Sequence, residues 1–164
     1  RSNATSRLTR KSAPRIGITQ AQNKRIQKIL DTINEESYRK PILNGGNSPS
    51  WILGHLTEAD DALLELMGIG QRLYPELKTT YHHEKGSNQS GHLSQSEITQ
   101  KWKAIQQQLD NAFRSWNEND WMSRHTAVPE EDFKKEPHRN KLNVLLSRVA
   151  HKASHLGQLA MQKG

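Results

Sequence analysis

Apolar residues recur every three to four positions in four stretches of about 20 residues, and this period constrains the fold more than any other feature. A period near 3.6 predicts amphipathic α-helices, and no stretch of useful length alternates as a half-buried β-strand does. The expected helices cover about residues 18–39, 49–67, 95–116 and 140–160. Four such helices pack most economically as a four-helix bundle, so we expect an all-α, single-domain fold.

Start and stop signals support these boundaries. Serine or threonine caps a helix by accepting a backbone N–H bond, and a glutamate or glutamine three residues later can complete a capping box. Such residues precede three of the stretches: Ser48, Ser94 with Glu97, and Thr19 with Gln22. Gly68 suits the C-terminal cap of the second helix, because glycine readily adopts the left-handed conformation needed there.

The lengths of the connections predict how the helices follow one another. A short turn after residue 39 favours antiparallel packing of the first two helices as neighbours. The connections 69–93 and 118–139 are long enough to allow crossovers from one end of the bundle to the other. We therefore expect the second and third helices to run in the same direction, with both long connections packed over the bundle.

The net charge of +7 is concentrated near the N-terminus. Residues 1–25 contain seven lysines and arginines and no acidic residue, which leaves 17 basic against 17 acidic residues in 26–164. Nucleic-acid binding needs a basic patch on the fold, which this distribution does not predict. We expect residues 1–17 to be a basic, flexible tail and residues 18–164 to form the domain. The opening "RSNA" is typical of an expression-tag remnant, so part of the tail is expected to be foreign.

Several absences exclude whole classes of protein. Without cysteine the chain has no disulfide, no zinc–thiolate cluster and no cysteine nucleophile. No run of 18 or more apolar residues exists, so no membrane partner is expected. No apolar signal core follows the N-terminus, so the expected location is the cytoplasm.

Three histidines point to a metal site. His151 and His155 are one helical turn apart, so their imidazoles project from the same side of the fourth helix. His55 lies early in the second helix. If the two helices meet, the third imidazole would complete a site with three protein ligands and an open position, as catalytic metal centres have.

A helical wheel leaves a second interpretation open. The apolar residues of the fourth helix cluster on one face: Leu142, Leu146, Val149, Ala153, Leu156 and Ala160. His151 and His155 fall roughly opposite the centre of that face, where they would be solvated polar residues unless that side lines a cleft. His55 lies at the margin of the apolar stripe of its helix, where a lone histidine is often a residue at the edge of the core.

The segments "SPSWILGHL" and "LNVLLSRVAHKASHLGQLA" resemble the DinB-like superfamily of four-helix bundles. Its members typically carry one histidine early in the second helix and two in an "H…HxGQL" segment of the last. The resemblance spans residues 18–164 and implies that His55, His151 and His155 bind a divalent metal, commonly nickel or zinc. Three neutral imidazoles suit these metals better than magnesium or calcium, which prefer oxygen ligands.

Other residues are weaker candidates. Glu58 lies one turn after His55, where it would orient a ligand or hold a water, or else be a solvated surface residue. His82 and His83 lie in a polar loop, where adjacent histidines are usually exposed. The polar segment 121–140 would form either a pocket wall or a plain surface connection. Lys152 follows His151 where a zincin protease would have its glutamate, so a protease of that kind is excluded.

Two classes of function remain. A metal-dependent enzyme would use the ion to activate water or an incoming low-molecular-weight thiol, as a hydrolase or a thiol S-transferase. The resemblance implies this class, because the superfamily includes thiol-dependent transferases, and the partner would be a small-molecule substrate. The alternative is a non-catalytic metal-binding or interaction bundle. The sequence identifies no general base, and it leaves open whether the chain forms a homodimer.

Overall fold

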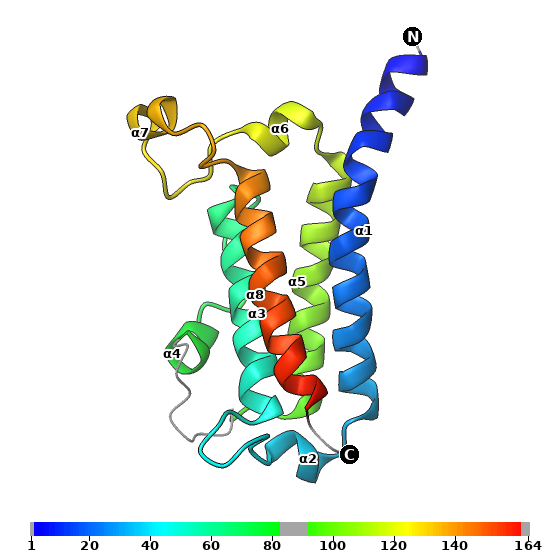
Figure 1. Cartoon of the computed structure of the whole chain (residues 1–164), viewed down its shortest axis with the longest axis vertical. Coiled ribbons are helices and arrows are strands. Elements are labelled where there is room, and N and C mark those ends of the chain that lie inside the picture. The colour runs from blue at the N-terminus through cyan, green and yellow to red at the C-terminus, as the bar shows by residue number, and fades with distance from the viewer. Residues whose placement is uncertain (1, 83–91, 162–164) are drawn as a thin grey trace.

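The computed structural model describes residues 2–82 and 92–161, with side chains from residue 17 onward. Four long helices form a bundle (Figure 1): α1 (Ser2–Thr32), α3 (Pro49–Leu66), α5 (Gln95–Ser115) and α8 (Lys141–Ala160). Four short helices lie in the connections: α2 (Glu35–Arg39), α4 (Leu77–Tyr81), α6 (Glu118–Met122) and α7 (Glu130–Lys135). Over the described ranges the only strand-like pairing is one isolated bridge between Arg124 and Asn140. The predicted all-α four-helix bundle is therefore confirmed.

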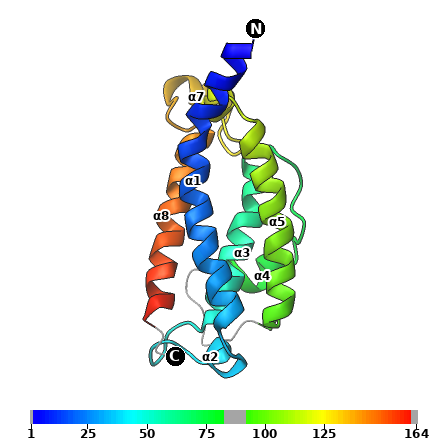
Figure 2. The same cartoon turned by 90° about the vertical axis from the view of Figure 1, so that its right-hand side faces the viewer.

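The helices run in the directions that the long connections predicted. α3 and α5 run the same way, and α1 and α8 run opposite to them (Figures 1 and 2). Among the long helices, α1 packs against α5 and α8, and so does α3, so that α1 and α3 lie diagonally across the bundle. The expectation that they are neighbours was wrong, because the chain between them includes α2 and crosses the end of the bundle instead of making a short turn. None of the helices described here has the length and apolar character needed to cross a membrane.

The first helix differs from the predicted span at both ends. α1 begins at Ser2 and ends at Thr32, and Asn34 starts α2 by accepting a bond from the backbone N–H of Ser37. Thr19 lies inside α1 and is buried, so it does not begin a helix as its spacing to Gln22 suggested. The backbone of residues 2–17 is helical, and whether the fold can dispense with residues 1–17 stays a prediction.

The other caps are as the sequence predicted. The hydroxyl of Ser48 accepts a bond from the N–H of Trp51, and Ser94 and Glu97 form both bonds of a capping box. Gly68 has a φ of 67° and ends α3, where its N–H and that of Ile69 bond to carbonyl groups of the last turn. These caps fix the level at which each helix begins and ends, and so the register in which the bundle packs.

The connections contribute unequally to the core. α4 packs on α3 through buried Leu77 and Tyr81, and α6 buries Trp121 at the other end of the bundle. α7 has no buried residue and projects from the bundle (Figure 1). The expectation that both long connections pack over the bundle therefore holds for α4 and α6 and fails for α7.

The buried face of α8 is not the one that the helical wheel selected. Leu146 is 52% exposed, and Ala153 and Ala160 are also exposed. The residues that α8 buries form a different set: Leu145, Lys152, His155, Leu156 and Leu159. The wheel was wrong because it grouped only the apolar residues, whereas the bundle also buries Lys152 and His155.

Candidate metal centre

The structure brings the three predicted histidines together between α3 and α8. The Nε2 atom of His151 lies 3.1 Å from Nε2 of His55 and 3.2 Å from Nε2 of His155. One ligand atom from each of the three lies within 4.8 Å of the others, so the group could hold a metal ion. The histidines of α8 therefore face another helix and are not solvated residues on an outer face.

Hydrogen bonds to the other ring nitrogens fix two of the imidazoles. His55 donates its Nδ1–H to the carbonyl oxygen of Tyr81 at 2.6 Å, since that oxygen can only accept. His155 donates its Nδ1–H to the side-chain oxygen of Gln158 at 2.9 Å. In a neutral imidazole with a proton on Nδ1, Nε2 carries a lone pair. Such outer contacts are the usual means by which metal-binding histidines are oriented.

The arrangement of the three Nε2 atoms suits binding to one shared cation better than hydrogen bonding among the three imidazoles. Nε2 of His151 can direct a proton at only one neighbour, so at least one of its two short contacts lacks a well-directed hydrogen bond. Two nitrogens bound at about 2.0–2.1 Å to one tetrahedral ion lie about 3.3–3.4 Å apart. The observed separations of 3.1 and 3.2 Å are close to this value. The donor set therefore fits a zinc-like ion.

Packing around His55 holds its ring in place. The ring stacks on Trp51, one turn earlier in α3, with centroids 4.8 Å apart and an angle of 10° between the planes. The Tyr81 ring lies so close to Gly54 that a Cβ atom there would overlap it. The missing side chain of Gly54 thus lets α4 approach α3, and that approach brings the Tyr81 carbonyl to His55.

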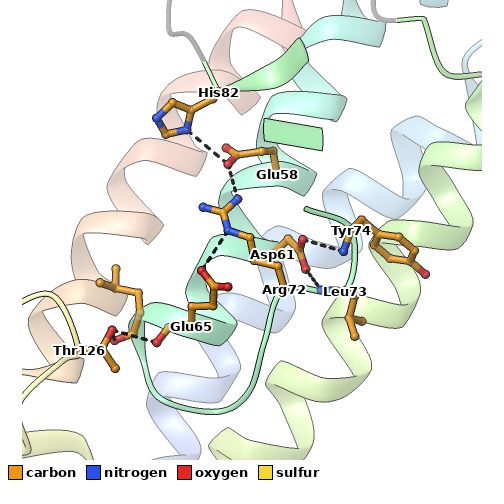
Figure 3. Close-up of polar contacts among 9 residues, drawn as sticks. Glu58, Asp61, Glu65, Arg72, Leu73, Tyr74, His82 and Thr126 are labelled. Carbon is orange, nitrogen blue, oxygen red and sulfur yellow. Dashed lines mark hydrogen bonds and ion pairs between the residues drawn. The ribbon is translucent and has the colours of Figure 1, made fainter. Parts of the chain in front are cut away.

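A second polar network fastens the connection that carries Tyr81. Arg72 bonds to Glu58 at 2.7 Å and to Glu65 at 3.3 Å, and both acidic residues lie on α3 (Figure 3). Asp61 accepts the backbone N–H groups of residues 73 and 74 (Figure 3). Burial raises the pKa of Asp61, and these two N–H donors oppose the rise. We call residues 69–82 the strap, because these bonds tie it to α3.

A model of the DinB superfamily matches residues 18–159. The chain belongs to this superfamily. No curated protein matches the sequence. The match includes the second half of α1, the whole of α3 and α5, and α8 up to residue 159, together with the three histidines. The DinB chain therefore has the fold and the histidine order that the sequence motifs implied.

The weaker candidates have other roles in the DinB chain. Glu58 is 2% exposed and paired with Arg72, so it is neither a solvated residue nor part of the histidine group. His82 has its Nδ1 atom 3.4 Å from a Glu58 oxygen and likewise lies outside that group (Figure 3). His83 lies outside the described residues.

The polar segment 121–140 has two different parts. Trp121 is buried in the core, whereas His125 and Arg139 line an open basin of about 580 Å³ that also borders α8. The pKa of His125 is lowered, first by burial and then by the nearby Arg139 and Arg124. Part of the segment therefore forms a pocket wall, at the end of the bundle where α8 begins.

Sequence reasoning missed a buried ion pair of the DinB chain, which joins α8 to α3. Lys152, between the two histidines of α8, bonds to Asp60 of α3 at 2.8 Å, and both side chains are buried. The sequence contains one clue, namely that Asp60 falls among apolar positions of the second helix. A buried charge must have a partner, but only the fold reveals which residue it is.

Proposed function

We propose that this DinB chain is a metal-dependent enzyme whose His55, His151 and His155 hold one divalent ion, nickel or zinc. The observation that carries the proposal is the convergence of three Nε2 atoms at spacings suited to one ion. Three protein ligands leave at least one position for water or substrate, as in catalytic rather than structural sites.

The chemistry that a bound ion would supply is Lewis-acid activation of water or of a low-molecular-weight thiol. The residues of the chain contribute by orientation. Tyr81 and Gln158 hold two imidazoles with Nε2 toward the shared point, and Trp51 covers one face of His55. His151 is only partly buried, so the group is reached from its side of the bundle. Because the chain has no cysteine, a reacting thiol would be a co-substrate.

A second candidate function is metal binding without catalysis. The ion pair between Glu58 and Arg72 favours this alternative. Glu58 is the acidic residue one turn from His55, and a carboxylate paired with an arginine is a poor general base. Within the described ranges, no carboxylate joins the histidine group. An ion with an exchangeable water would favour the enzyme, and a closed coordination shell would favour the alternative.

The decisive experiment is metal titration of untagged protein by calorimetry with zinc and nickel. His151→Ala removes one of three ligands and is expected to weaken binding by at least about 100-fold. His138→Ala, an exposed histidine in the basin, is the matched control and should bind as the wild type does. Equal affinity in the wild type and His151→Ala would refute the site. A screen of thiols with electrophilic substrates, run with loaded protein, then tests the transferase reaction.

A further inference from the structure

α8 has two apolar faces that compete for the core. The face selected by hydrophobic periodicity contains Leu142, Leu146, Val149, Ala153, Leu156 and Ala160. The face that the bundle buries is centred near Lys152 and Leu156. At 3.6 residues per turn the two differ by a rotation of roughly a quarter turn about the helix axis. Only the observed rotation turns His151 and His155 toward His55.

Apolar burial alone does not explain the observed choice. The observed face places Lys152 in the core and leaves Leu146 52% exposed. The other rotation of α8 would bury Leu146 and expose Lys152, which the hydrophobic effect favours. A specific interaction of Lys152 must therefore offset this preference.

That interaction is a closed ring of four side chains, one from each long helix. Lys152 donates to Asp60 at 2.8 Å and to Asn23 at 3.3 Å. Asn23 donates to Gln106 at 2.7 Å, and Gln106 donates to the same Asp60 oxygen at 2.6 Å. We call these residues the inner ring. Every bond in the ring joins different helices, so rotating α8 would break the two bonds made by Lys152.

A buried ion pair of this kind adds little net stability, because the loss of hydration offsets the attraction between the charges. Its best attested use is to specify one packing arrangement among several. The position of Lys152 fits such a use, because it directly follows His151 and precedes His155 by three residues. Any rotation of α8 that displaces the lysine displaces both histidines with it.

We propose that the inner ring is a positioning network, which selects the rotation of α8 that turns His151 and His155 toward His55. The link to metal binding rests on the proposed function, whereas the control of helix rotation does not. Lys152 and Asp60 act here through the histidines and not by touching a substrate.

Helix rotation can be measured without metal because the chain lacks cysteine. A Leu146→Cys reporter on α8 and a Leu43→Cys reference on the loop after α2 are 52% and 60% exposed as leucines, so both should react readily with a thiol reagent in EDTA. In Asp60→Asn/Lys152→Gln, which removes both charges with little change in shape, the α8 reporter should react about 5–10-fold more slowly. The Leu43→Cys reference should react at its original rate.

The same variant gives a second readout. Its affinity for zinc should fall at least about tenfold while its melting temperature stays near the wild-type value. The matched control is Glu131→Gln/Lys134→Gln, which removes an exposed ion pair of α7 and should change neither readout. If the ring variant does not fold, Gln106→Leu opens the ring but keeps the ion pair, and it should shift both readouts in the same direction by a smaller factor.

The outcomes separate the two proposals. Wild-type labelling rates in folded variants of the ring would overturn the positioning role, whatever the metal result. Slower labelling in a protein whose wild type binds no metal would refute the metal site and leave the control of rotation standing. Slower labelling together with weaker zinc binding would support both.

Discussion

α3 carries acidic residues on two of its sides, and these residues are close in sequence but have different partners. Toward the bundle interior, Asp60 is paired with Lys152 of another long helix. Toward the strap, Glu58 is paired with Arg72, and Asp61 accepts two backbone N–H groups (Figure 3). The inner contact joins helix to helix, whereas the outer contacts fasten a connection to a helix.

The two sides act on different members of the histidine group. The strap carries the Tyr81 carbonyl, which orients His55. The inner ring holds α8, which carries His151 and His155. α3 thus anchors both the strap, which orients His55, and the inner ring, which holds the helix of His151 and His155. Changes on the strap side should alter His55 alone, whereas changes in the ring should alter the two histidines of α8.

The largest expected effect on stability is from loss of the strap ion pair. Arg72→Met leaves Glu58 buried without its strongest partner, which should lower the free energy of unfolding by about 2–4 kcal/mol. The matched control is Arg39→Met, which breaks a more exposed pair with Glu35 and should cost less than about 1 kcal/mol. Urea unfolding measures both. Equal costs would show that the strap is not held by this pair.

The next effect concerns the close approach of the strap to α3. Gly54→Ala places a Cβ against the Tyr81 ring, so it should lower the free energy of unfolding by about 1–3 kcal/mol and weaken zinc binding through His55. Gly157→Ala in α8 meets no atom within 4 Å, so it should stabilise by about 0.5–1 kcal/mol through helix propensity. If both substitutions stabilise, the packing of Tyr81 on Gly54 is refuted.

A smaller effect should appear as a pH dependence. The pKa of Asp61 is raised above its ordinary 3.8, so the folded state binds this proton more tightly than the unfolded state does. The contribution of Asp61 to stability should therefore rise as the pH falls through its folded pKa, and be complete below 3.8. The free energies of unfolding of the wild type and Asp61→Asn, measured between pH 7 and 4, test this. The free energy of unfolding of the wild type minus that of Asp61→Asn should increase as the pH falls. A decrease in this quantity would contradict the prediction.

The smallest effect is expected from the N-terminus. Asn23 is the first residue along the chain that belongs to the ring, and the strap begins at residue 69, so deletion of residues 1–17 should leave both intact. The melting temperature should change by less than about 2 °C. A loss of several degrees, measured by calorimetry, would mean that the first half of α1 contributes to the bundle.

The sequence predicted the fold because its signals are local. Caps at Ser48 and Ser94 and the 3.6-residue period depend on neighbours a few positions away, so they can be recognised without knowing the tertiary structure. The break after Thr32 was missed although Asn34 is a good cap, because it is short and the helix α2 follows it directly. The buried face of α8 was missed because hydrophobicity alone cannot assign a lysine to the core.

In the candidate site, too, local features could be predicted from the sequence, whereas contacts between distant residues could not. The spacing of His151 and His155 is local. His55 was a candidate because it lies early in a second predicted helix, and the resemblance implied the same three ligands. The residues that orient them could not be predicted, because Tyr81 lies 26 positions from His55 and contributes a backbone carbonyl that any residue type has. The pairing of Lys152 with Asp60 spans 92 positions and depends on how four helices meet.

The contact between Gly54 and Tyr81 has a consequence for how related chains can vary. Because the ring occupies the space of a side chain at position 54, the two positions cannot both be large. A relative with alanine or serine at the first position must have a smaller residue at the second, or a strap that lies farther from the helix. Coupled variation at these two positions would therefore identify the relatives whose connection supplies a carbonyl to the first histidine.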